Sequence, residues 1–521
     1  GGDSIMSIQV IAKAGQAGIR LTPKQLFEAP TPAGLAELAG KGVMTVAEQE
    51  TLTGEVALTP IQKWFFEQRF AEPHHWNQSL LFALGQPLDV EALRRALAKI
   101  VDHHDALRLR FSPEGNRAFY VERETHDVLK TFDLRALAEA ERRTVIESEC
   151  ARLQTSFDLH NGPLFIAGYF DMGDEARLFL AAHHLVMDGV SWRILLEDIQ
   201  SAYGQAAAGA EIRLPAKTTS WRYWAGKLDE YVGSAAAQGE LEYWTHYERQ
   251  LAARLPVDFP EGAAQNVEET AERLGVELSA EQTRTLLQEI LAEEKVQIND
   301  VLLAALTQAL AAWSGKRAFL VEMEGHGRES LFEEVNLART VGWFTTVFPL
   351  FVKSERGASA KETVRSISAM FARLPHHGIG YGLLRQGGSS EIREKLAALP
   401  AAEIAFNYLG QFDQLTTAGS PFKPAAEHKG AERSPHAQRT HLLEVTAVVS
   451  GGRLRIEWEY SRVVHRLESV RELATHFTRA LEEIIEGGDS AAPQVEKISK
   501  IDQRQLGKVL GQLNKGKGKS A

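Results

Sequence analysis

One stretch of the chain reads His183-His184-Leu185-Val186-Met187-Asp188-Gly189-Val190-Ser191-Trp192. It lies where the apolar run 178–182 predicts the end of a buried strand and the following residues predict a helix. A histidine at such a point can act as a general base near neutral pH, with a nearby carboxylate fixing the geometry. An isolated His-His pair is more often structural, so the neighbouring sequence has to decide. The stretch itself indicates an α/β fold.

The sequence on both sides of this stretch alternates helices and strands. Before it, Val90, Leu93, Leu97 and Ile100 predict a helix that starts at Asp89, and strands are expected near 106–111 and 164–171. After the Trp-rich residues 221–244, helices are expected at 279–292, 299–313 and 468–486, a strand at 318–323, and a hairpin of 442–449 and 454–460 around Ser450-Gly451-Gly452. We therefore expect two α/β lobes, residues 56–232 and 233–490.

Composition excludes several classes of protein. Hydrophobic residues make up 44% and charged residues 24% of the chain, as in folded globular proteins. The net charge is -11 and the basic residues are dispersed except at the C-terminal end, so no nucleic-acid partner is expected. The most apolar stretch, 301–313, is too short to span a membrane. The single Cys150 excludes a disulfide framework or a cysteine-based zinc cluster and favours a cytoplasmic location.

The His-His-x-x-x-Asp-Gly pattern resembles the active-site motif of the condensation-domain superfamily of nonribosomal peptide synthetases. Further matching strings occur in family order over about residues 57–486, which makes coincidence implausible. They are Pro60-Ile61-Gln62-Lys63-Trp64-Phe65, Pro73-His74-His75-Trp76-Asn77-Gln78, Arg339-Thr340-Val341-Gly342-Trp343-Phe344-Thr345, Gly378-Ile379-Gly380-Tyr381-Gly382 and Phe406-Asn407-Tyr408-Leu409-Gly410-Gln411-Phe412. The resemblance implies two chloramphenicol-acetyltransferase-like lobes in a V-shaped pseudodimer that acts on carrier-bound thioesters.

A second motif indicates the subtype. Glu324-Gly325-His326-Gly327-Arg328-Glu329 resembles the motif of epimerization domains, and condensing relatives generally lack this glutamate. The resemblance implies epimerization of an L-aminoacyl or peptidyl thioester to an L/D mixture, with His184 and Glu324 as two bases on opposite faces of Cα and His183 in support. Without the motif, Glu324 would be an ordinary solvated carboxylate. The alternatives are a peptide-bond-forming condensation domain and a noncatalytic carrier-docking module of the same fold.

The resemblance also implies supporting contacts. Asp188, which by sequence alone would cap the following helix, is expected to form a salt bridge with Arg339 across the floor of the site. Asn407 or Tyr408 is expected to donate a hydrogen bond to the thioester oxygen of an enolate-like intermediate. No metal or nucleotide site is expected, because the sequence has neither a Walker-type glycine loop nor a ligand cluster beyond the paired histidines.

The N-terminal residues form a separate unit. Gly1-Gly2-Asp3-Ser4-Ile5 resembles the carrier-domain site at which 4'-phosphopantetheine is esterified to serine, here Ser4, and this start is interpreted as a fragment boundary. Residues 4–14 predict one short amphipathic helix, and Thr31-Pro32 predicts the start of another. We therefore expect a partial, all-helical carrier domain at 1–40 and a linker at 41–55. Phosphopantetheine is the only cofactor expected.

The C-terminal tail, 491–521, has one narrow apolar stripe. Asp502 could cap a helix that carries Leu506, Val509, Leu510 and Leu513 on one face. It resembles the short helix by which one synthetase subunit docks onto the next, although packing on the chain's own C-terminal lobe is nearly as good an interpretation. The other expected partners are the upstream adenylation domain, the chain's own carrier domain and a phosphopantetheinyl transferase. The sequence does not specify the amino acid.

Overall fold

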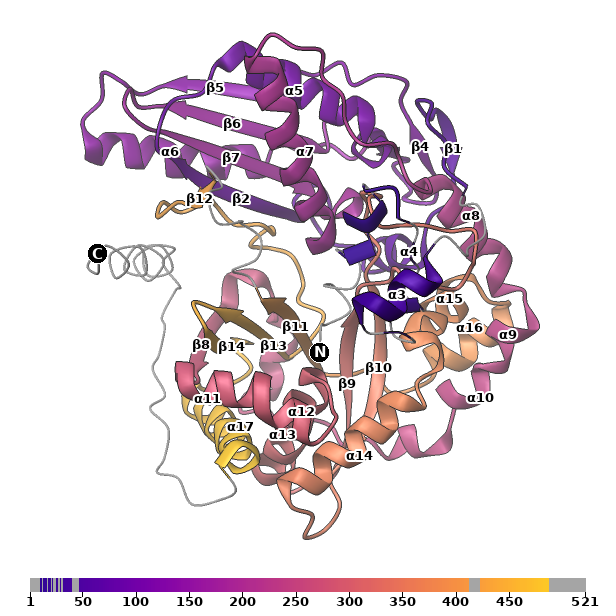
Figure 1. Ribbon diagram of the computed structural model, residues 1–521. Coiled ribbons are helices and arrows are strands. Elements are labelled where there is room, and N and C mark those ends of the chain that lie inside the picture. Colours follow the sequence, from indigo (N-terminus) through magenta and orange to yellow (C-terminus); the bar gives the residue numbers. More distant parts are fainter. Residues whose placement is uncertain are drawn as a thin grey trace.

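The computed structural model describes residues 46–411 and 422–486, together with short runs between 10 and 39. Two α/β lobes are present, and each has its own central sheet (Figure 1). Among the N-terminal runs, α3 (Pro32–Leu38) begins at Thr31, whose hydroxyl accepts the Gly34 N–H, as the sequence predicts. Ser4 and the expected C-terminal helix lie outside the described residues. None of the described helices is long and apolar enough to cross a membrane.

The N-lobe is built on a five-stranded sheet in the order β12-β2-β7-β6-β5. Its own strands are β2 (Asn77–Leu84), β5 (Leu129–Asp133), β6 (Phe165–Asp171) and β7 (Ala176–His183). Helices α5 (Val90–His103) and α7 (Gly189–Ala207) pack on one face, and α6 (Glu139–Gln154), which contains the buried Cys150, packs on the other. Asp89 caps α5 as predicted.

The expected strand at 106–111 is only half right. Residues Asp105–Arg108 form a 3₁₀ turn, because the Arg108 guanidinium is buried and donates to the Asp105 carboxylate and to the carbonyl of Leu52. The strand β3 (Leu109–Phe111) then joins β1 (Gly54–Val56) and β4 (Ala118–Tyr120) in a small separate sheet.

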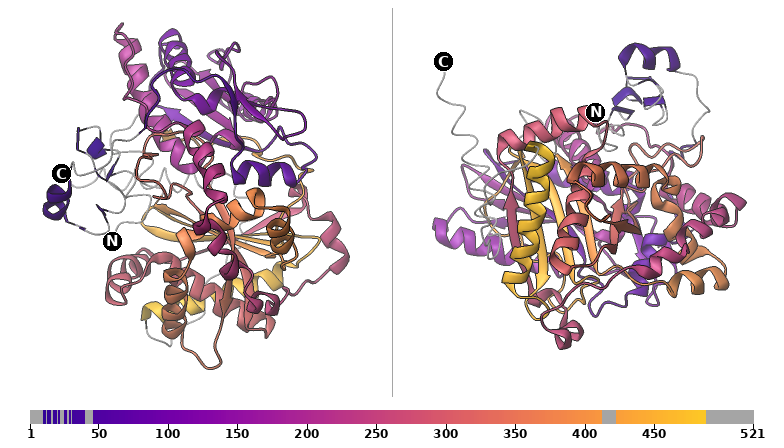
Figure 2. Two further views of the ribbon diagram at one scale, coloured as in Figure 1. Left: turned by 90° about the vertical axis from the view of Figure 1, so that its right-hand side faces the viewer. Right: turned by 90° about the horizontal axis from the view of Figure 1, so that it is seen from below.

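The C-lobe is built on a six-stranded sheet in the order β10-β9-β11-β13-β14-β8. The helices α13 (Ile298–Ser314), α14 (Ala360–Ala372) and α17 (Leu467–Glu486) cover its outer, apolar face (Figure 2). The predicted hairpin is confirmed, with Gly451 and Gly452 both at positive φ. The strands are β8 (Ala271–Glu277), β9 (Ala318–Gly325), β10 (Thr346–Lys353), β11 (Ile404–Gln411), β13 (Leu443–Ser450) and β14 (Arg453–Ser461).

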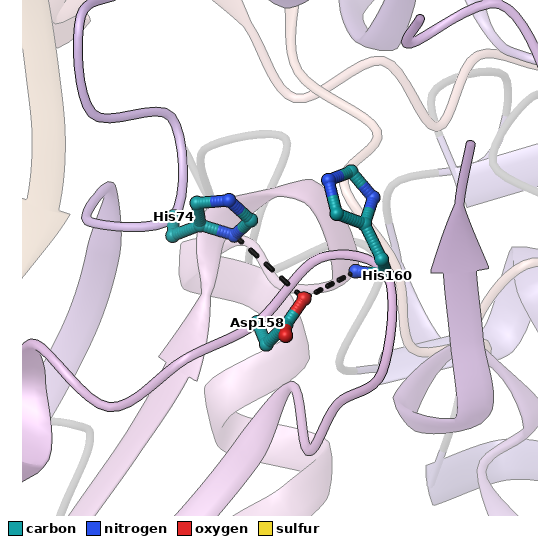
Figure 3. Close-up of side chains that lie close together, drawn as sticks. All are labelled: His74, Asp158 and His160. Atoms are coloured by element: carbon teal, nitrogen blue, oxygen red, sulfur yellow. Dashed lines mark hydrogen bonds and ion pairs between the residues drawn. The ribbon is translucent and has the colours of Figure 1, made fainter. Parts of the chain in front are cut away.

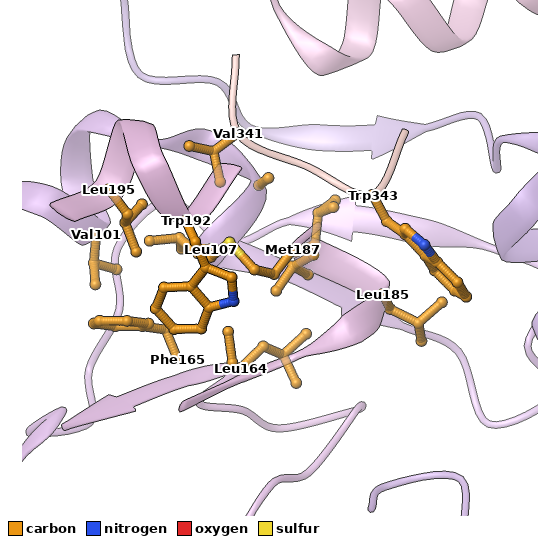
Figure 4. Packing of buried hydrophobic residues seen from close by; sticks show 14 of the residues in the cluster. Val101, Leu107, Leu164, Phe165, Leu185, Met187, Trp192, Leu195, Val341 and Trp343 are labelled. Atoms are coloured by element: carbon orange, nitrogen blue, oxygen red, sulfur yellow. The ribbon is translucent and has the colours of Figure 1, made fainter. Parts of the chain in front are cut away.

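Two segments of the second half of the chain return to the N-lobe. The β9–β10 loop, residues 326–345, inserts Val341 and Trp343 into the N-lobe core beside Leu185, Met187 and Trp192 (Figure 4). Residues 422–439 form the second segment, and their strand β12 (Lys423–Pro424) pairs with β2. Segments from the second half of the chain therefore pack around residues 183–192 of the N-lobe.

Shorter helices complete the junction between the lobes. They are α4 (Pro60–Glu67), α8 (Trp221–Val232), α9 (Ala235–Gly239), α10 (Leu241–Trp244), α15 (Ile379–Gly387) and α16 (Ser390–Ala397). Helix α15 contacts α4, α8 and β10, so it bridges elements of both lobes.

Candidate active site

His184 stands at the junction of β7 and α7. Its backbone N–H donates to the Trp76 carbonyl at 2.8 Å, and its Nδ1 lies 2.7 Å from the Met187 carbonyl oxygen. Because a carbonyl can only accept, Nδ1 carries the ring proton and Nε2 presents its lone pair. The side chain is half-buried, and burial holds the pKa of His184 below its ordinary value. His184 is therefore a neutral base at physiological pH.

Gln78 controls the orientation of this base. The Trp192 indole N–H donates to Gln78 Oε1 at 3.0 Å, which turns the amide nitrogen of Gln78 toward His184 Nε2, also at 3.0 Å. An N–H group that faces Nε2 favours the neutral ring over the protonated one. Gln78 belongs to one of the family strings, but no role for it could be inferred from the sequence. Only the strand pairing reveals the role of Gln78, because β2 lies beside β7 with Gln78 opposite Ala182, two residues before His184.

His183 points away from the site. Its Nε2 donates to the Pro73 carbonyl at 2.8 Å and its Nδ1 accepts the Leu185 N–H at 3.2 Å. The ring is fully buried, which lowers the pKa of His183 to about 3. These contacts fix the backbone that carries His184.

Glu324 lies near the end of β9, on the sheet face that is turned away from the covering helices. Its Oε2 accepts a hydrogen bond from Asn407 Nδ2 at 2.7 Å. The side chain is reached by solvent, although protein atoms surround much of the carboxylate. The resulting loss of hydration, together with the negative charge of the neighbouring Glu322, raises the pKa of Glu324 to about 7. Glu324 is therefore able to donate or accept a proton near neutral pH.

The structure separates the two residues expected at the thioester oxygen. Asn407 lies in the site, but its amide donates to Glu324. Tyr408 follows it on β11, so its side chain leaves the opposite face of the sheet and packs against the C-lobe core. The structure therefore brings Asn407, and not Tyr408, to Glu324.

Arg433 connects the two candidate bases. It lies in the segment 422–439, and its guanidinium lies 4.3 Å above the ring of Trp76 and 2.9 Å from Glu268 Oε1. Its positive charge opposes protonation of both His184 and Glu324, although burial has the larger effect on each. Arg433 therefore adds positive charge to the surroundings of both candidate bases. Sequence reasoning missed Arg433 because no motif surrounds it.

The expected salt bridge between Asp188 and Arg339 is wrong. Asp188 is paired with Arg328, whose Nη2 lies 3.1 and 3.2 Å from the two carboxylate oxygens. Asp188 also caps α7 by accepting the Ser191 N–H at 2.7 Å, and it accepts the Phe344 N–H at 3.1 Å. The Arg328 guanidinium lies 3.8 Å above the Phe344 ring. Asp188 therefore holds the β9–β10 loop against the start of α7.

Arg339 lies further along α7. It donates to Glu197 at 2.9 Å and to Asp198, and Asp198 also contacts His104 Nε2 at 2.9 Å. The path of the loop explains why Arg328, and not Arg339, is the partner of Asp188. The loop brings Arg328 to the first turn of α7 and Arg339 to its third turn. Both arginines pin the same loop at different points.

Three possible metal ligands, His74, Asp158 and His160, come together in the N-lobe (Figure 3). At least one polar atom of each is engaged in a hydrogen bond with nearby backbone. His74 Nδ1 accepts the Leu159 N–H at 3.0 Å, Asp158 accepts the His160 N–H at 2.8 Å, and His160 Nδ1 donates to the Phe111 carbonyl at 2.8 Å. We interpret the cluster as a support for the loop.

Comparisons with known proteins identify the family. A model of the condensation domain matches residues 52–507, and a model of the phosphopantetheine attachment site matches residues 1–39. The chain belongs to the condensation-domain family. One of the linear gramicidin synthase proteins from Brevibacillus parabrevis is 43% identical over 99% of this chain, and tyrocidine synthase 2 from the same organism is 37% identical over 93%. The chain spans only 10% and 14% of these relatives.

Solved structures agree with this assignment. The epimerization domain from the third module of tyrocidine synthetase B matches with a TM-score of 0.79 and 36% identity, over 85% of this chain and 99% of that one. The SgcC5 protein of Streptomyces globisporus matches with a TM-score of 0.65 at 18% identity, over 84% of this chain and 100% of that one, which shows the fold alone. The predicted two-lobed, chloramphenicol-acetyltransferase-like fold, the carrier fragment and the phosphopantetheine cofactor are confirmed for this condensation-family chain.

Proposed function

We propose that this condensation-family domain epimerizes an aminoacyl or peptidyl group held as a phosphopantetheine thioester. The observation that carries the proposal is that Glu324 stands just before the β9–β10 loop, while Trp343 near the end of that loop packs 4.4 Å from the His184 ring. His184 is neutral, with an Nε2 lone pair that faces the Gln78 amide, while Glu324 has a pKa of about 7. The likeness to a solved epimerization domain supports the same conclusion.

The two groups suit proton removal and return at Cα. The thioester carbonyl acidifies the Cα–H bond; when a base takes the proton, the bonding electrons move to the carbonyl oxygen and form an enolate. A proton delivered to the opposite face of Cα then gives the other enantiomer. Neutral His184 serves as the base in one direction and protonated Glu324 as the acid, and the roles reverse for the return reaction. The positive charge of Arg433 favours the developing negative charge.

The phosphopantetheine arm on Ser4 supplies the reactive thioester and carries it between domains. The partners proposed for the chain are an upstream adenylation domain, which selects the amino acid, its own carrier domain, a phosphopantetheinyl transferase and a downstream synthetase subunit reached through residues 491–521. We propose a cytoplasmic location for this assembly.

Condensation is the second candidate, because a condensing domain uses the same histidine. Glu324 in its full motif, held by Asn407 and with a raised pKa, argues against it. A noncatalytic docking module would not need the hydrogen-bonded chain from Trp192 through Gln78 to His184.

One experiment separates these functions. The chain is incubated with an L-aminoacyl pantetheine thioester in the presence of a second, acceptor aminoacyl thioester, and the products are resolved by chiral chromatography. Epimerization predicts the D-isomer and no amide. Amide formed without the D-isomer would establish condensation, and neither product with any of several amino acids would contradict both.

A further inference from the structure

An apolar cavity lies where α4, α8, α15 and the β9–β10 loop meet. Its volume is about 40 Å³, counted as the space open to the centre of a water molecule. Because one water needs about 10–15 Å³ by this measure, the space corresponds to about three waters, the bulk of a branched aliphatic side chain. Both lobes contribute to the lining, which includes Trp64, Leu228, Trp343, Val347, Ile379 and Gly382.

The cavity adjoins both candidate bases. Trp343 forms part of its wall, and the Trp343 ring lies 4.4 Å from the ring of His184. Val347 forms another part and is the direct cross-strand partner of Glu324 in the β9–β10 pair. Directly paired residues of an antiparallel sheet place their side chains on the same face. The cavity therefore begins one side chain away from each base.

The lining offers the cavity only a few polar groups. Arg385 and Gln386 both direct their nitrogen atoms to the Glu67 carboxylate, each at 2.7 Å, and leave their apolar stems toward the cavity. In the described part of the chain, three polar atoms of the lining are buried and make no hydrogen bond: Thr59 Oγ1, Trp343 Nε1 and Thr346 Oγ1. These three atoms are the ones able to hold a water in the cavity, and an apolar side chain that enters displaces it.

We propose that this cavity is a side-chain subsite: it receives the apolar side chain of the aminoacyl group while Cα lies between His184 and Glu324. The inference rests on the proposed function and adds a substrate class, namely aliphatic residues of about the size of valine or leucine. A charged side chain would lose its hydration there and would find neither a carboxylate nor an uncommitted cation among the lining residues. The domain itself then contributes selectivity beyond that of the adenylation domain.

Gly382 provides the test, because it lines the cavity from α15. A Cβ built at Gly382 meets only the Pro60 side chain, at an ordinary 3.4 Å, so the helix accepts a larger residue whose end enters the cavity. The matched control is Gly204→Leu in α7, an exposed helical glycine with no atom within 4 Å of the added Cβ. The substrates are alanyl, leucyl and lysyl pantetheine thioesters, and α-deuterium incorporation in heavy water gives kcat/KM.

The unaltered chain should prefer the leucyl to the lysyl thioester. Gly382→Leu should lower the leucyl-to-alanyl ratio of kcat/KM at least tenfold, as expected when a pocket loses space for several methylene groups. Gly204→Leu should leave this ratio unchanged. A complementary variant, Val347→Ala, should raise the ratio of phenylalanyl to leucyl turnover because it enlarges the cavity.

The outcomes separate the subsite from the function. An unchanged leucyl-to-alanyl ratio in Gly382→Leu, including a uniform loss with both substrates, overturns the subsite but leaves the epimerase intact. Exchange that is absent from the unaltered chain with every substrate overturns the proposed function itself.

Discussion

The buried pair of Asp188 and Arg328 makes the sharpest structural prediction. Arg328 is only 5% exposed, and burial already lowers its pKa, so its charge depends on the Asp188 carboxylate. Asp188→Asn removes the counter-charge and strands a buried cation. Breaking such a pair costs about 3–5 kcal/mol of unfolding free energy, whereas replacing both partners by apolar groups costs far less.

A double-mutant cycle measures this coupling. The free energy of unfolding is determined by urea denaturation for Asp188→Asn, Arg328→Met and the double variant, and a second cycle uses Arg339→Met as the matched control. We expect a coupling energy above about 2 kcal/mol for Asp188 with Arg328. For Asp188 with Arg339 we expect additivity within about 0.5 kcal/mol. Additivity in the first cycle, or strong coupling in the second, would refute the assignment of Arg328 as the partner.

Three further predictions concern the site. If the two bases share one proton, kcat/KM in both directions follows one bell-shaped pH profile. It falls as pH rises through about 7, where Glu324 loses its proton. On the acid side it falls only below the ordinary histidine pKa of about 6.5, because the pKa of His184 is lowered. Activity that still increases above pH 8 would contradict this. Gln78→Leu removes the donor that favours neutral His184, so the acid limb should move to higher pH, and an unmoved limb would exclude that role. A phosphopantetheinyl transferase should label Ser4 in a complete carrier domain, and labelling that persists in Ser4→Ala would disprove the assignment.

Local signals in the sequence were enough for much of the fold. The helix at Asp89 and the hairpin at Gly451-Gly452 follow from a cap and a turn, which depend on neighbouring residues. The region 106–111 was half wrong because long-range contacts of the buried Arg108 pull its first residues into a turn. No local pattern contains that information.

The site divides in the same way. His184 and Glu324 carry motifs, so a resemblance could name them. Gln78 and Arg433 act through contacts with residues more than 70 positions away, and only the paired strands and the returning segment bring them to the site. The partner of Asp188 depended on the path of one loop, which sequence spacing does not determine.

The central claim, that His184 and Glu324 act as two bases on opposite faces of Cα, is tested most directly in heavy water. An L-aminoacyl thioester is supplied to the unaltered chain, His184→Ala and Glu324→Gln, and both α-deuterium content and chirality are followed. The unaltered chain should produce the D-isomer carrying α-deuterium. Each variant should lose inversion, with exchange surviving in at most one of them because a single base can still act on its own face. Inversion at the unaltered rate in either variant would contradict the two-base account.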